Sequence, residues 1–179
     1  MLTEFTRDAL FTAGWFGLMA MVWFGWAQEA PPRSWRVWLG AGSVVGTLLA
    51  VGCGVAVPMN WDSPSALEGR YAWFGVLVAV DVLAAGVGCW VLARRGAARW
   101  MAWWVALVVA VHFLPLAWLL EDAGMALVGA GLTVALLVLR PRLRDRPGPT
   151  SAVVGVTMGA TLLAAGLVAA AVGVPQILG

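Results

Sequence analysis

The chain has few of the residue types on which catalytic and metal sites depend. It contains one histidine and two cysteines among 179 residues, and 11% of its residues are charged. A single histidine excludes the H-E-x-x-H zinc motif and ligation of haem by two histidines. No phosphate-binding loop or dinucleotide fingerprint occurs either. We therefore expect no metal and no cofactor, and among enzymes only a lipid-processing activity without a recognisable motif stays open.

The cysteines and the histidine are also poorly placed for pairing. Cys53 and Cys89 each lie near the C-terminal end of an apolar segment, and the two segments are expected to be antiparallel. At 1.5 Å per helical residue they are separated by roughly 18 Å across the membrane, too far for a disulfide. Ser43 and His112 likewise differ in depth, so a Ser–His dyad is excluded.

Long apolar runs dominate the sequence instead. Hydrophobic residues make up 62% of the chain and the mean hydropathy is +0.89. A helix needs about 20 apolar residues to cross a bilayer, and backbone groups in lipid must be satisfied within the segment. The runs lack the alternation of strands, so the sequence predicts an all-α, polytopic transmembrane bundle of six spans in a single domain, residues 1–179. The predicted spans are residues 9–27, 37–57, 71–93, 100–120, 123–139 and 151–173.

Arginine, the only strongly basic residue present, is distributed unevenly between the two sets of loops. The loops after the first, third and fifth spans hold nine arginines: Arg33, Arg36, Arg94, Arg95, Arg99, Arg140, Arg142, Arg144 and Arg146. The other two, Arg7 and Arg70, lie on the opposite side. Because basic loops stay in the cytoplasm, the chain is predicted to be N-out and C-out. The composition favours a bacterial cytoplasmic (inner) membrane, and the N-terminus lacks the basic start of a cleaved signal peptide.

The positive-inside rule and the attraction of arginine to anionic membrane lipids are enough to explain the arginines in these short loops. We therefore expect membrane lipids as partners and no nucleic acid. Oligomeric state stays open, with a homo-oligomer such as a dimer as one alternative.

The loop of residues 58–70 is the longest on the predicted outer side. Polar and aromatic residues of this loop and the next outer loop form a predicted outer mouth: Asn60, Trp61, Asp62, Glu68, Glu121 and Asp122. The alternative is an ordinary interfacial turn anchored by Trp61. Ser65 and Glu68 have the spacing of a capping box, which predicts that the third helix begins there, before it enters lipid.

Two titratable side chains lie inside the apolar spans, Asp81 in the third and His112 in the fourth. Both are about 13–15 Å from the outer end of their span at 1.5 Å per residue, so antiparallel neighbours would bring them into one layer. Ionisable residues at this depth usually face the bundle interior and mark ion or proton pathways. Asp81 shares a helix face with small residues, which favours an inward position: Ala84, Ala85 and Gly88.

Pro115 follows His112 by three residues and cannot donate to the Val111 carbonyl, so it is predicted to kink the fourth span. A helix broken in this way often lines a cavity in a transporter. The sequence therefore predicts a small transporter or channel with a proton- or cation-sensitive site at Asp81, His112 and Pro115, which would act on a small ion or small molecule. The alternative is a structural or interaction protein in which the pair only stabilises packing.

Glycines four positions apart predict where helices approach closely. Gly42 and Gly46 have this spacing in the second span, and Gly155 and Gly159 have it in the sixth. Such spacing is typical of tightly packed membrane helices.

The segment V-H-F-L-P-L-A, residues 111–117, resembles the H-F-L-P-L-A segment of an uncharacterised family of small, about six-span bacterial integral membrane proteins. The Trp15-Phe16-Gly17 opening and the number of spans are similar as well. The resemblance implies the same six-helix fold and no particular activity. The many tryptophans do not make the chain similar to the tryptophan-rich sensory proteins, because residues 28–36 lack their Trp- and Pro-rich loop and those proteins have five spans.

Overall fold

Six long α-helices form most of the computed structural model, which describes residues 1–178. The helices are α1 (Thr6–Ala27), α2 (Arg36–Met59), α3 (Tyr71–Arg94), α4 (Met101–Leu119), α5 (Ala123–Arg144) and α6 (Ser151–Leu178). Short 3-10 turns, η1 (Arg33–Trp35) and η2 (Ala98–Trp100), precede α2 and α4. Each of the six helices is long and apolar enough to cross a membrane. The prediction of an all-α, six-span membrane bundle is confirmed.

The fifth helix is longer than the predicted fifth span. The predicted span ends at residue 139, whereas α5 continues through Pro141 to Arg144. The last turn carries the exposed Arg142 and Arg144 on either side of the buried Leu143, and the Arg99 guanidinium donates to the Leu143 carbonyl oxygen at 2.8 Å. The loop after it holds Gly148 in the left-handed region (φ 88°), which turns the chain toward α6.

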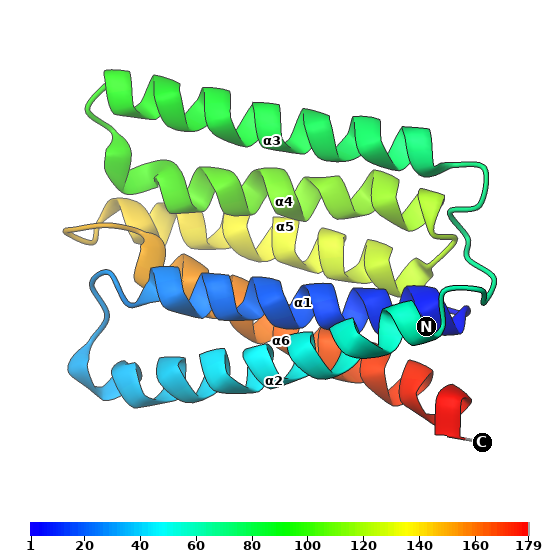
Figure 1. Ribbon diagram of the computed structural model, residues 1–179. Coiled ribbons are helices and arrows are strands. Elements are labelled where there is room, and N and C mark those ends of the chain that lie inside the picture. Colours follow the sequence, from blue (N-terminus) through cyan, green and yellow to red (C-terminus); the bar gives the residue numbers. More distant parts are fainter. Residues whose placement is uncertain (179) are drawn as a thin grey trace.

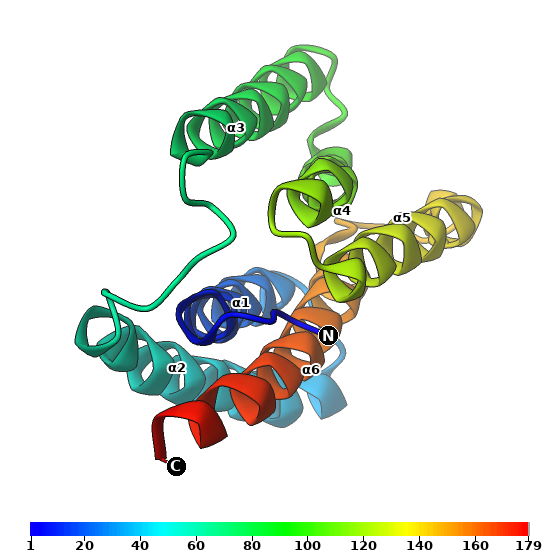
Figure 2. The same cartoon turned by 90° about the vertical axis from the view of Figure 1, so that its right-hand side faces the viewer.

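The helices divide into a closely packed group and a more open one. α1 packs extensively on both α2 and α6, while α4 packs on α5 and α3 packs chiefly on α4. Figure 1 shows the helices running side by side, with the N-terminus and the end of α6 at the same end of the bundle. Figure 2 shows α3 set apart from α1 and α2, at the outer side of α4.

Glycines allow the backbone of α1 to approach its two neighbours. A Cβ atom on Gly17 would lie 2.7 Å from the Gly46 carbonyl oxygen, and a Cβ on Gly46 would lie 2.7 Å from the Gly17 oxygen. A Cβ on Gly155 of α6 would lie 2.5 Å from the Trp23 oxygen, and Gly159 faces the Phe24 ring. The close approach predicted from glycine spacing in the second and sixth spans is therefore confirmed.

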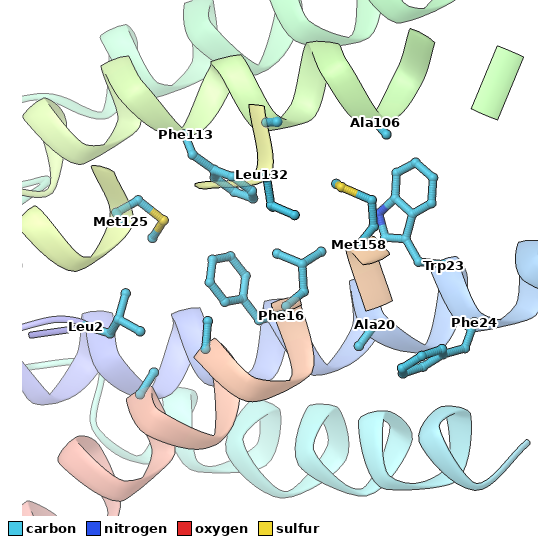
Figure 3. Packing of buried hydrophobic residues seen from close by; sticks show 14 of the residues in the cluster. Leu2, Phe16, Ala20, Trp23, Phe24, Ala106, Phe113, Met125, Leu132 and Met158 are labelled. Carbon is cyan, nitrogen blue, oxygen red and sulfur yellow. The ribbon is translucent and has the colours of Figure 1, made fainter. Parts of the chain in front are cut away.

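The apolar core lies where α1 meets α4, α5 and α6. Phe16 is 2% exposed and its ring meets that of Phe113 edge-on, with 5.4 Å between centroids. Figure 3 shows Phe16, Phe113, Leu132 and Met158 converging from four helices. The core thus joins the first helix to the second half of the chain and does not include α3.

Candidate functional site

Asp81 of α3 and His112 of α4 lie in contact within the membrane-spanning part of the molecule. His112 Nδ1 is 3.2 Å from Asp81 Oδ1, and the side chains are 14% and 16% exposed, respectively. The two helices are antiparallel neighbours, so the similar depths estimated from the sequence do bring the groups together. Asp81 and His112 together are called the intramembrane polar pair.

The contact has the distance of an ion pair without the alignment of a hydrogen bond. Asp81 Oδ1 and His112 Nδ1 are buried atoms, and neither makes a hydrogen bond of acceptable angle among the described residues. The distance shows that the two groups are close, and the angles show that no aligned hydrogen bond joins them. Unsatisfied polar atoms in an apolar layer are costly. The pair therefore places two polar atoms without an aligned partner in the apolar layer.

The face of α3 that carries Asp81 is turned toward α4. Ala84, Ala85 and Gly88 are partly shielded, whereas Val80 and Leu83 on other sides of the helix are exposed. The predicted inward position of Asp81 is confirmed with respect to α4. However, no residue of α3 is fully buried, so the site lies at the edge of the bundle and not at its centre.

Trp104 of α4 makes a second contact with the same face. Its indole Nε1–H donates to the Ala84 carbonyl oxygen at 3.1 Å. A Cβ on Gly88 would lie 1.8 Å from that nitrogen, so only glycine leaves room for the ring. Trp104 is one of twelve tryptophans, and no local pattern distinguishes it from the others. With the intramembrane polar pair, it holds α3 against α4.

Pro115 does not interrupt α4 as predicted. The helix is continuous from Met101 to Leu119, and Pro115 is exposed. Membrane helices tolerate internal proline because local adjustments satisfy the freed carbonyl. α4 is therefore unbroken beside His112, and the kink at Pro115 stays a prediction.

Three residues of the predicted outer mouth make contacts that stabilise helix ends or the outer loops. Asn60 donates to the Ala56 carbonyl oxygen at 2.9 Å, which closes the end of α2. Glu121 pairs with Arg70 at 2.7 Å. Asp122 is 3% exposed and accepts a hydrogen bond from the Met125 N–H at 3.1 Å, so it caps α5. Asp62 is exposed, and the outer mouth stays a prediction.

Arg7 and Asp8, at the start of α1, bind the α2–α3 loop. Arg7 lies over the Trp61 ring at 5.3 Å, donates to the Trp61 carbonyl oxygen, and is 3.4 Å from Glu68 Oε1. Asp8 is 5% exposed and accepts hydrogen bonds from the Ser65 hydroxyl at 2.6 Å and from a backbone N–H at 2.7 Å. The sequence suggested only a topological role for Arg7, and these long-range contacts could not be read from it.

The predicted capping box forms only a turn. The Ser65 N–H donates to Glu68 Oε1 at 3.2 Å, as such a box requires. The Ser65 hydroxyl, however, donates to Asp8, and Gly69 adopts φ 75°, which ends the turn. α3 begins afterwards, at Tyr71. The prediction that the third helix starts at the box is wrong.

Cys53 is buried and Cys89 is half-buried, and both are free thiols. Cys89 follows Gly88 on the half of α3 that faces α4. The prediction that the cysteines do not pair is confirmed.

Comparison with protein-family models, with curated proteins and with solved structures found no match for this chain. The resemblance carried by residues 111–117 therefore stays a prediction. What the protein does has to be argued from the intramembrane polar pair and its surroundings.

Proposed function

We propose that the protein is a small transporter or channel of a bacterial cytoplasmic membrane, and that the intramembrane polar pair is its proton- or cation-sensitive element. The observation that carries this proposal is the 3.2 Å contact between Asp81 and His112 on two membrane-spanning helices. Such groups are rare in spans and usually mark ion or proton pathways.

The surroundings of the pair support a change of helix position as the response. An unpaired charge in an apolar layer is strongly unfavourable, so binding or release of a proton or cation at the pair would change how firmly α3 is held against α4. Water or a small cation then enters between the helices. α3 can yield because it packs chiefly on α4, whereas α1 is held on several sides.

The distribution of arginine supports the orientation. The nine arginines belong to the α1–α2, α3–α4 and α5–α6 connections and the helix ends beside them. These connections lie at one end of the bundle, and the termini lie at the other (Figure 1). By the positive-inside rule the arginine-rich end is cytoplasmic. A substrate from outside would approach the pair from the end of α3 that begins at Tyr71.

The test is flux into liposomes that contain the purified protein. Proton and monovalent-cation flux is measured for the wild type, Asp81→Asn and His112→Gln. The control is Thr157→Val, which removes a membrane-embedded hydroxyl that bonds only to its own helix at Val153. We expect Asp81→Asn and His112→Gln to reduce flux by at least about tenfold, as general acid–base groups commonly contribute more than that. Thr157→Val should match the wild type.

Wild-type protein that is folded and conducts neither protons nor monovalent cations would exclude this proposal. So would an Asp81→Asn variant with full flux.

The second candidate is an interaction protein, and the position of α3 favours it. No residue of α3 is buried, and Val80, Leu83 and Val87 leave a continuous apolar face free to meet another membrane helix. In that case the intramembrane polar pair only stabilises packing. The wild type would then show no flux, and the loss of stability in Asp81→Asn would exceed the average for a polar contact between membrane helices, about 0.6 kcal/mol.

A further inference from the structure

A cavity opens between α3, α4 and α5 at the arginine-rich end of the bundle, away from the intramembrane polar pair. Its volume is about 300 Å³, at the lower limit of ligand sites. The residues that line it are Leu92, Trp100, Trp103, Trp104, Arg140 and Arg144.

Two arginines form the charged rim. Arg140 and Arg144 are four residues apart on α5, so they lie on one face and repel each other. The Arg140 guanidinium lies over the Trp103 ring, 5.4 Å from its centroid. Within residues 1–178, no carboxylate lies within 4.0 Å of either guanidinium, and the neighbouring Asp145 forms no ion pair with them. The rim therefore has an unmet positive charge that an anion would balance.

The inner wall of the cavity is apolar and fixed in position. Trp103 donates its indole N–H to the Leu136 carbonyl oxygen at 2.9 Å, and Trp104 donates to that of Ala84 at 3.1 Å. Both indole donors are occupied, so these rings offer apolar surface to the cavity. Leu92 of α3 completes the wall. A cationic rim above an apolar wall matches a molecule that joins an anionic group to a hydrocarbon chain.

We propose that this cavity binds an anionic phospholipid, with its phosphate on Arg140 and Arg144 and the start of one acyl chain against the tryptophans and Leu92. Basic pockets between membrane helices on the cytoplasmic side bind such headgroups, and interfacial tryptophan suits that depth. The shared chemistry is a phosphate anion, and the apolar wall favours a lipid over free phosphate. α4 lies between α3 and α5 (Figure 2), so the lipid bridges two helices that have little direct contact.

The site is independent of transport, and its test measures binding and stability. Delipidated protein in a neutral detergent is titrated with phosphatidylglycerol, phosphatidylcholine or inorganic phosphate. Thermal unfolding gives the shift in Tm, and native mass spectrometry counts the retained lipids. The variant is Arg140→Gln with Arg144→Gln. The control is Arg33→Gln with Arg36→Gln, which removes two exposed arginines at the same end of the bundle, outside the cavity.

Phosphatidylglycerol should raise the Tm of the wild type and of the control and remain bound in the spectrometer. In the Arg140 and Arg144 variant its apparent affinity should fall about thirty-fold, the effect of two arginines near an anionic surface. Equal binding by variant and control overturns the site. Equal stabilisation by phosphatidylcholine overturns the anionic ligand, and equal stabilisation by inorganic phosphate overturns the lipid.

Discussion

α1 and α3 are both apolar membrane-spanning helices, yet α1 is buried within the bundle and α3 lies at its edge. α1 has thirteen buried residues, and α3, whose apolar window is the more hydrophobic of the two, has none. In water the more apolar helix would be expected inside. In a membrane, lipid is as apolar as a protein core, so hydrophobicity does not decide which helix is central. Here close backbone contact through glycine, at Gly17 and Gly155 for example, places α1 at the centre.

α3 uses small residues differently. Its Gly88 admits a tryptophan ring from α4, and its Asp81 meets a histidine. α3 meets α4 through an indole and a titratable contact, and its Phe74 and Leu77 pack against the core, whereas α1 is held by backbone contact along two neighbours. Substitutions in the two helices should separate the effects of these two kinds of contact.

Gly17→Ala should have the largest effect on stability. The new Cβ would lie 2.7 Å from the Gly46 oxygen and 2.8 Å from the Ala50 nitrogen, and backbone atoms cannot easily move aside. We expect a loss of about 3 kcal/mol, at the upper end of overpacking effects. Thermal unfolding in detergent, followed by circular dichroism, measures it.

The matched control is Gly25→Ala on the same helix, where no atom lies within 4 Å of the position that the new methyl group would take. It should be neutral or gain up to about 1 kcal/mol through helix propensity. Equal destabilisation by both changes would show that glycine contact does not set the position of α1.

Asp8→Ala should loosen the α2–α3 loop from the start of α1. The buried carboxylate accepts two hydrogen bonds from the α2–α3 loop, and hydrogen bonds to charged groups contribute about 1.5–3 kcal/mol. We expect a loss of about 2 kcal/mol and faster proteolysis between residues 60 and 70. Asp62→Ala, at an exposed site of the same loop, should change neither.

Gly88→Ala should weaken the contact of α3 with α4 without disturbing α1. The Trp104 ring must rotate away, and its hydrogen bond to Ala84 is lost, at about 1–2 kcal/mol. Hydrogen exchange should increase in α3 while that of α1 is unchanged. Gly86→Ala, which has open space around it, is the control. Faster exchange in both helices would contradict the view that α3 is attached independently of α1.

Asp81→Asn should have the smallest effect on stability. Polar contacts between membrane helices average about 0.6 kcal/mol, and the contact with His112 lacks hydrogen-bond alignment. A loss of more than about 2 kcal/mol in thermal unfolding would show that the pair acts mainly as a packing element.

Hydropathy was enough to predict the spans, and glycine spacing was enough to predict that the second and sixth spans pack closely. Residue counts along antiparallel spans predicted the meeting of Asp81 with His112. They could not predict that α3 is peripheral, because lipid-facing and protein-facing apolar residues are chemically alike. Trp104 was indistinguishable from the other tryptophans, since its role depends on a glycine in another helix. Asp8 and Ser65 are 57 positions apart in the chain, and no local pattern links them.

The thiol of Cys89 can be used to measure how accessible the space between α3 and α4 is to water. It lies beside Gly88 on the half of α3 turned toward α4, while Cys53 is buried elsewhere in the bundle. Maleimides and iodoacetamides react with thiolate, which forms where water is present. The rate of alkylation at Cys89 relative to Cys53 therefore records how often water reaches the space between α3 and α4, in the unmodified chain and in native membranes.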